Sequence, residues 1–242
     1  CSTSFSMLQR FLIVAIAATA TALRMQAQGC ASVPAGLSAW FTFDETLFDK
    51  ATRVPGIGKS GLRFDGVSQF FEFPKNTPGF NVGSSDFSVE FWIRTTDSKR
   101  TRNLVDFRSF TPKGYLMFVR AGAIGMQVVD EADLSQSVAT GFSVADGRWH
   151  HVVGVAKRLP PQPAAIFVDG VKRGQSGRNV PITNIDHDTP MWLARHHKNG
   201  YINRDNIFFA GDLDEVSVYR RALAPSEIAA LYRAGTKGKC RK

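Results

Sequence analysis

Cysteine is scarce in this 242-residue sequence: there are three, at positions 1, 30 and 240, so none lies within the body of the chain. This distribution argues against a Cys–His nucleophile. The sequence also lacks a Gly-x-Ser-x-Gly elbow, a glycine-rich phosphate loop before a helix, internal repeats and low-complexity tracts. These absences exclude the common serine and cysteine hydrolases and the phosphate-loop nucleotide enzymes.

The sequence has no apolar run long enough to span a membrane, which takes about 20 residues. Its main run, residues 11–23, follows Met7 and Arg10 and precedes small and polar residues that lead to Cys30. This order predicts a secretory signal peptide. We therefore expect residues 1–29 to be signal peptide and upstream residues, and residues 30–242 to form one secreted domain. A lipid anchor on Cys30 is the alternative, because Gly29 precedes it.

The sequence is rich in hydrophobic residues and carries a large positive net charge. Hydrophobic residues make up 43% of the chain, and the 19 phenylalanines suit a sandwich that is filled from two inner faces. The formal net charge of +9 favours polyanionic partners, with solubility alone as the alternative explanation. For an exported protein this charge indicates an acidic polysaccharide and not a nucleic acid.

Alternating hydrophobicity predicts about a dozen short strands and one helix, the pattern of an antiparallel β-sandwich. The clearest strand covers residues 87–94, in which one face carries Phe87, Val89, Phe91 and Ile93. The remaining expected strands are residues 37–44, 61–64, 70–73, 104–107, 115–120, 124–129, 149–156, 164–168, 171–173, 191–194 and a last strand around 213–219. Residues 46–60 are expected to be a loop, residues 133–140 are ambiguous, and a helix should run from an N-cap at Ser226 to Gly235.

Five segments, in this order, carry a family resemblance. They are residues 40–45 (WFTFDE), 61–66 (GLRFDG), 149–153 (WHHVV), 167–170 (FVDG) and the C-terminal stretch from GDLDEV at 211–216 through YRRAL at 219–223 to Tyr232. The sequence resembles the laminin G-like domains of the concanavalin A-like lectin/glucanase superfamily. This resemblance implies an all-β fold, an antiparallel jelly-roll β-sandwich with one short C-terminal helix.

The resemblance also implies a disulfide. The first and last strands are neighbours in this superfamily, which would bring Cys30 and Cys240 together. Closing so long a loop is worth about 4–5 kcal/mol on loop-closure entropy. Two free thiols, or a lipid on Cys30, remain the alternatives.

Catalysis is considered because the superfamily includes glucanases, which carry paired carboxylates on one strand. The nearest match is Asp212-x-Asp214-Glu215. Asp214 and Glu215 are adjacent, so they would point to opposite faces of a regular strand. We therefore expect no enzyme activity and no catalytic residue.

Calcium is a cofactor that the resemblance implies, held by Asp side chains and backbone carbonyls at strand ends. The candidates are Asp44, Asp65, Asp212 and Asp214. Turn formation, or ion pairs with Arg63 and Arg220, would explain the same residues without a metal. The pairs at 150–151 and 196–197 are not expected to chelate zinc, because adjacent strand residues point oppositely.

A sugar site would use an aromatic platform with nearby polar groups. Trp92 is the candidate platform, with Glu90 and Arg94 on the same face of its strand, and with further candidates Tyr115, Trp192, Arg195, His196, Asn199 and Tyr201. The alternative is that the tryptophans are packed under loops. Basic clusters at 99–102, 172–178, 195–204 and the C-terminal tail would suit a sulfated or uronic-acid polysaccharide.

Together these features predict a secreted, non-catalytic recognition module for glycans, including acidic polysaccharides, or for extracellular matrix. A structural subunit of an extracellular assembly and a divergent polysaccharide-cleaving enzyme are the alternatives. The sequence leaves the oligomeric state open.

Overall fold

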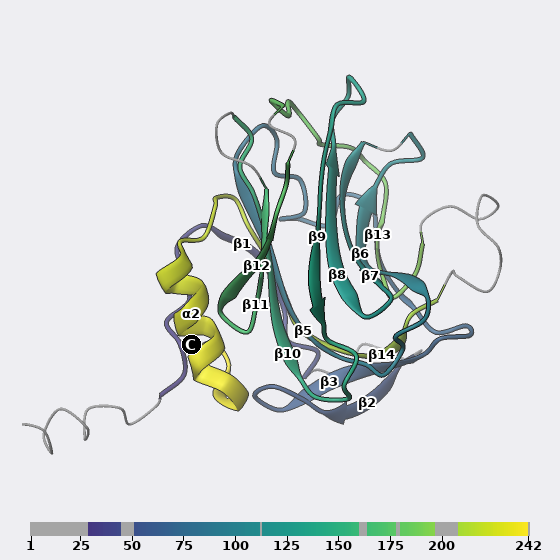
Figure 1. Ribbon diagram of the computed structural model, residues 1–242, viewed down its shortest axis with the longest axis vertical. Coiled ribbons are helices and arrows are strands. Elements are labelled where there is room, and N and C mark those ends of the chain that lie inside the picture. The colour runs from purple at the N-terminus through teal and green to yellow at the C-terminus, as the bar shows by residue number, and fades with distance from the viewer. Residues whose placement is uncertain are drawn as a thin grey trace, which may run out of the picture.

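The computed structural model describes residues 29–44, 51–111, 113–159, 164–177, 180–196 and 208–241. Two antiparallel sheets pack face to face as a sandwich (Figure 1). The expected all-β sandwich is thus confirmed. The expected signal peptide lies outside the described residues.

The larger sheet has eight strands in the order β12-β11-β10-β5-β14-β3-β2, with β1 also pairing with β14. Their bounds are β1 Leu37–Phe41, β2 Thr52–Pro55, β3 Ser60–Asp65, β5 Phe87–Arg94, β10 His150–Ala156, β11 Ala165–Val168, β12 Val171–Gln175 and β14 Ala210–Tyr219. The smaller sheet has six strands in the order β4-β13-β6-β7-β8-β9. These are β4 Phe71–Phe73, β6 Thr101–Arg108, β7 Gly114–Arg120, β8 Ala123–Val129, β9 Ser135–Ser143 and β13 Met191–Leu193.

The core lies between the two sheets, and β5 shows how the sequence builds it. Phe87, Val89, Phe91 and Ile93 expose 0% of their surface, as the alternation predicts. The next strands of the sheet, β10 and β14, contribute Val152, Leu213 and Val218 to the same cluster. Burial of each such side chain stabilises the fold by about 1.5–3 kcal/mol.

Two strands differ from the expectation, and both lie at sheet edges. β2, in the segment expected to be a loop, pairs only with β3, and three of its four residues are exposed. β9, in the ambiguous polar segment, alternates buried and exposed residues beside β8. β2 buries only Val54, and two of the three buried residues of β9, Gln136 and Thr140, are polar, so neither strand shows a hydrophobic periodicity.

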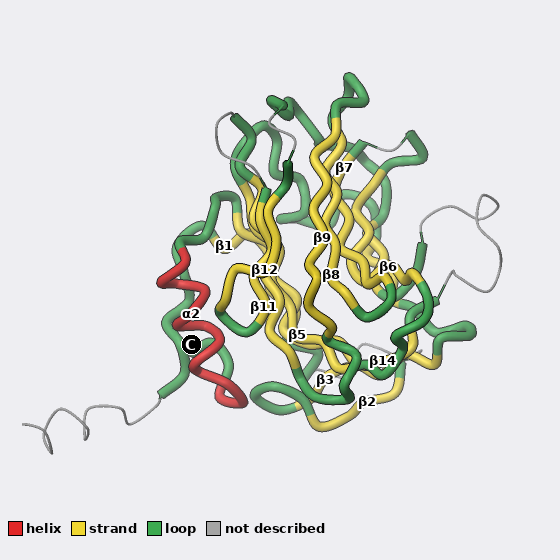
Figure 2. Tube along the Cα trace, viewed as in Figure 1, coloured by secondary structure: helices red, strands yellow, loops and turns green. Residues whose placement is uncertain are grey.

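The one α-helix of the described residues, α2 (Pro225–Ala234), packs on the outer face of the larger sheet (Figures 1 and 2). Ile228, Leu231 and Ala234 meet Val153 and Tyr219 there. The prediction of Ser226 as N-cap was wrong. The N-cap is Ala224, because Pro225 presets the first helical turn, while Glu227 accepts the Ala224 N–H at 2.8 Å. Gly235 ends the helix as expected, with a φ of 53°.

The C-terminal tail continues across this outer face. A disulfide joins Cys30 to Cys240, which confirms the expected bridge. The bridge uses the sulfur that a lipid anchor on Cys30 would need. Beside it, Ala31 donates to the Gly238 carbonyl at 2.9 Å and accepts the Cys240 N–H at 2.8 Å. These contacts hold Lys239 against the sheet.

Lys239 reaches a buried carboxylate at the centre of the larger sheet. Its Nζ lies 3.1 and 3.0 Å from the two oxygens of Glu90, which also accepts the Tyr219 hydroxyl at 2.6 Å and contacts His151 Nε2 at 3.2 Å. Burial alone would raise the pKa of Glu90, but the charge of Lys239 and the contacts with His151 and Tyr219 lower it to about 2. The tail is therefore tied to the sheet by a compensated buried charge.

No helix in the described ranges is long and apolar enough to cross a membrane.

Replacing Lys239 by Met should lower the free energy of unfolding by about 3–5 kcal/mol, because Glu90 would be left buried without its counter-charge. Urea unfolding measures the loss. Lys237→Met is the matched control, since Lys237 is exposed two residues earlier. Equal losses in the two variants would contradict the role assigned to Lys239.

His150 should make stability depend on pH. Its ring contacts Asp169 at 2.8 Å and Asp146 at 3.0 Å, and the hydrogen bond with Asp169 chiefly raises its pKa above the usual 6.5. A raised pKa stabilises the fold fully below about pH 6.5, and this contribution is lost as the pH rises through the folded value. His150→Gln should therefore cost more stability at about pH 5.5 than at about pH 8.5 in urea unfolding. A pH-independent difference would contradict this.

Candidate functional site

The residues expected to form a sugar site on β5 are covered. Trp92 exposes 5% of its surface, and Tyr232 of α2 stacks on its ring with centroids 6.3 Å apart. Glu90 exposes 1% and belongs to the Lys239 network. Arg94 remains half-exposed but pairs with Asp212 at 2.6 Å. Trp92 therefore offers no stacking face to a ligand.

The other expected sugar-binding residues lie on different parts of the fold. Tyr115 is fully buried in the core, where its hydroxyl donates to the Phe80 carbonyl at 3.2 Å. Trp192 on β13 exposes 6% and donates to Glu72 at 2.8 Å. The Arg195 guanidinium lies over the Phe70 ring at 4.4 Å. Asn199 and Tyr201 lie outside the described residues.

The four aspartates expected to bind calcium do not converge. Asp44 accepts the Ser60 N–H and pairs with Arg241, and Asp65 accepts the backbone N–H groups of residues 67–69. Asp212 pairs with two arginines, and Asp214 accepts the Ile57 N–H at 2.7 Å. In the described part of the chain, no three His, Cys, Asp or Glu side chains form a metal-binding group. These residues do not fit a calcium ion.

The expectation that Asp214 and Glu215 face opposite ways was wrong. A β-bulge interrupts the pairing of β14 with β5 there, and Glu215 has a φ of 54°. Leu213 and Val216 both enter the core, so the two acids between them share the outer face. Burial and the neighbouring Glu215 charge raise the pKa of Asp214 to about 8.

This carboxylate pair is nevertheless closed off. Glu215 accepts the indole N–H of Trp40 at 2.8 Å, and it pairs with Lys239 at 3.2 Å and with Arg241 at 3.1 Å. Glu215 exposes 1% and Asp214 0% of its surface. The tail thus covers the acids, and a polysaccharide has no access to them in this structure.

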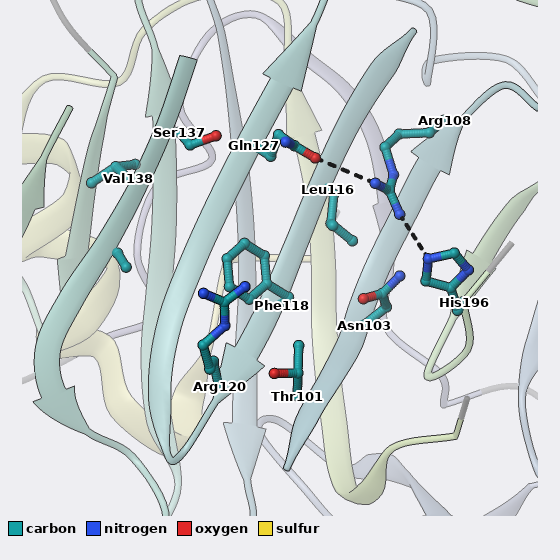
Figure 3. Close-up of a pocket in the computed structure, with 11 residues that line it drawn as sticks. Thr101, Asn103, Arg108, Leu116, Phe118, Arg120, Gln127, Ser137, Val138 and His196 are labelled. Carbon is teal, nitrogen blue, oxygen red and sulfur yellow. Dashed lines mark hydrogen bonds between the residues drawn. The ribbon is translucent and has the colours of Figure 1, made fainter. Parts of the chain in front are cut away.

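An open hollow lies on the other side of the sandwich, on the outer face of the smaller sheet. A hollow of about 580 Å³ opens there across β6, β7, β8 and β9 (Figure 3). Its lining mixes polar, aromatic and aliphatic residues: Thr101, Asn103, Arg108, Leu116, Phe118, Arg120, Gln127, Ser137, Val138, Ala139 and His196. Of the expected sugar-binding residues that the structure describes, only His196 belongs to it.

Phe118 lies in the middle of the hollow (Figure 3). It pairs across the sheet with Gly125 on β8, and a Cβ on Gly125 would come within 2.1 Å of the Phe118 ring. The ring therefore lies over the glycine and stays half-exposed, with the Arg120 guanidinium over the ring, 5.4 Å from its centroid. A flat apolar ligand face that stacks on this supported ring would have to displace the exposed Arg120 side chain.

Polar groups line one side of the hollow beside the ring. Buried Asp106 holds Arg108 through two hydrogen bonds of 2.8 and 3.0 Å and accepts the Asn103 amide at 2.7 Å. Arg108 also donates to Gln127 at 3.3 Å and lies 3.5 Å from His196 Nε2. These contacts fix donors and acceptors before any ligand arrives.

Sequence reasoning missed Phe118, although a signal for it exists. Residues 115–120 alternate, with Tyr115, Met117 and Val119 in the core, so Phe118 falls on the outer face. Gly125 interrupts the next strand, which indicates a close approach by a neighbouring group.

The sequence comparisons agree with this architecture. Residues 65–229 match the Laminin_G_3 family of the concanavalin A-like lectin/glucanases superfamily. The chain belongs to this superfamily. No curated protein matches the sequence.

Solved structures of similar fold include binding domains of bacterial toxins. The binding domain of Paraclostridial Mosquitocidal Protein 1 aligns with a TM-score of 0.62 at 18% identity, over 85% of this chain and 51% of that chain. The binding domain of Botulinum Neurotoxin serotype G gives 0.59 at 15% identity, over 81% and 46%. The superfamily member described here thus spans about half the length of these chains, and at such identities the likeness concerns the fold.

Gly125→Ala should lower the free energy of unfolding by about 1–3 kcal/mol, because the new methyl group would displace the Phe118 ring. In a Phe118→Ala background the same change should cost close to nothing. Gly141→Ala, in β9 with no atom within 4 Å of the added Cβ, is the matched control and should change stability by less than about 1 kcal/mol. A Gly125→Ala cost that persists without the Phe118 ring, measured by urea unfolding, would contradict this packing.

Proposed function

We propose that this chain is an exported, non-catalytic recognition module that binds a glycan in the hollow of the smaller sheet. The observation that carries the proposal is the Phe118 ring, supported on Gly125 and flanked by Arg108, Gln127 and Asn103. A pyranose has an apolar face that stacks on an aromatic ring and hydroxyls that need donors and acceptors beside it. Both requirements are met within one hollow of about 580 Å³.

The absence of acids from this hollow supports a binding role. Among the described residues that line it, none is Asp or Glu, whereas glycoside hydrolysis requires two carboxylates beside the bond. Asp106, an acid beside the hollow, is buried and accepts hydrogen bonds from Arg108 and Asn103. The similar structures are themselves described as binding domains, which is consistent with this role.

Positive charge in the hollow favours a glycan with acidic groups. Arg120 is exposed at its edge, whereas the charge of Arg108 is compensated by Asp106. Uronic-acid or sulfated sugars would gain attraction from Arg120, and this part of the binding should weaken as salt is added.

The test is a glycan array followed by titration of the best ligand. Phe118→Ala should weaken binding about fivefold to tenfold through the lost stacking, and Gln127→Ala should weaken it through lost hydrogen bonds. Phe110→Ala is the matched control, because Phe110 is 65% exposed and lies outside the hollow.

Two results would overturn the proposal. One is the absence of binding to any neutral or acidic glycan on the array. The other is a bound glycan whose affinity is unchanged in both Phe118→Ala and Gln127→Ala.

A further inference from the structure

Two arginines of the larger sheet share one buried carboxylate. Asp212 on β14 lies opposite Arg63 on β3 and opposite Arg94 on β5, so the three residues form a row across adjacent strands. Arg63 donates from Nε and Nη2 at 2.8 and 3.1 Å, and Arg94 donates from Nε at 2.6 Å. The side chain of Asp212 is 2% exposed, against 53% for Arg63 and 27% for Arg94. The buried Asp212 carboxylate therefore fixes the orientation of both guanidiniums.

Part of each guanidinium remains unused. Within the described ranges, Nη1 of Arg63 and both Nη atoms of Arg94 have no hydrogen-bond partner. The Arg94 guanidinium also lies 4.9 Å from the centroid of the Trp149 ring, which restricts it further. Both arginines line a hollow of about 470 Å³ together with Thr95, Thr96, Gly147, Ala210, Gly211 and Asp212. Oriented donors therefore face an open space.

Two guanidiniums at this hollow share one carboxylate. Asp212 compensates one of the two positive charges of Arg63 and Arg94. Of the neighbouring acids, Asp146 is paired with Arg148 and His150. Asp65 keeps its negative charge, but both of its oxygens accept hydrogen bonds from residues 67–69 of its own turn. An anion here would thus be held by the oriented N–H groups of Arg63 and Arg94.

We propose that Arg63 and Arg94 bind a tetrahedral oxyanion, the sulfate or phosphate group of an esterified ligand. A single guanidinium fork satisfies a planar carboxylate, whereas two forks from different strands can reach several oxygens of a tetrahedral group. This site lies on the larger sheet, while the Phe118 hollow lies on the outer face of the smaller one. The two sites are therefore independent, and either can exist without the other.

The direct test is NMR titration of the arginine Nε–H signals of the ¹⁵N-labelled protein with inorganic sulfate, inorganic phosphate and acetate at constant ionic strength. Sulfate and phosphate should shift the Arg63 and Arg94 signals saturably, and acetate should bind more weakly. Arg63→Gln and Arg94→Gln should each lower the affinity by at least about tenfold, because each removes charge-assisted hydrogen bonds.

Matched variants separate this site from general surface charge. Arg148→Gln removes a neighbouring arginine that has its own partner, and Phe118→Ala alters only the glycan hollow, so both should bind sulfate as the wild type does. Arg63→Lys keeps the charge but loses the fork, and it should bind as weakly as Arg63→Gln. Thermal melting verifies that each variant is folded. If Arg94→Gln does not fold, the affinities of Arg63→Gln and Arg63→Lys decide the test, because Arg63 is the more exposed arginine.

Three results would overturn the proposal. They are shifts that never saturate, an Arg148→Gln loss equal to that of Arg63→Gln, and full affinity in Arg63→Lys. If the anion site is established, glucose 6-sulfate and glucose 6-phosphate are titrated in parallel. The one that binds more tightly shows whether the site prefers a sulfate or a phosphate ester.

Discussion

The architecture depends on one buried charge, the carboxylate of Glu90 at the centre of the larger sheet. A carboxylate with 1% exposure is tolerated only when a counter-charge and hydrogen bonds replace water. Its counter-charge, Lys239, comes from the end of the chain, so the sheet requires the tail to lie across it. The disulfide to Cys30 and the backbone bonds of Ala31 hold the tail in that place. The outer face of the larger sheet is consequently covered around Glu90, Trp92 and Glu215.

Periodicity reveals which strands are half-buried and fails where burial is slight. In β5, each inward side chain meets the opposite sheet, so the pattern is complete and the bounds are predictable. β2 has neither a second neighbouring strand nor a run of buried residues, and its last residue is Pro55. Its strand conformation comes from pairing with β3, a tertiary interaction that local sequence does not contain.

The site was harder to predict than the fold. Hydrophobic alternation along a strand indicates on which face of the sheet a side chain lies, but it does not indicate which other elements cover that face. Trp92 does lie on the polar face of β5, but α2 and His151 cover that face. To predict the role of Phe118, the register between β7 and β8 must be known as well as the face on which the side chain lies. The turn at Ala121 and Gly122, both with positive φ, fixes that register and sets Phe118 opposite Gly125. A glycine facing an outward aromatic residue across a two-residue turn is therefore a usable sign of a supported ring.

Net charge alone is a poor guide to where an anion would bind, because several of the basic side chains make ion pairs or hydrogen bonds within the fold. Lys239 and Arg241 serve the buried acids Glu90 and Glu215, and Arg158 donates to the carbonyls of residues 83, 85 and 182. What holds an anion is a set of charged N–H donors in a fixed orientation. Arg63 and Arg94 provide such donors, since one carboxylate orients both guanidiniums. The larger sheet, though closed at its centre, thus keeps an electrostatic site beyond the reach of the tail.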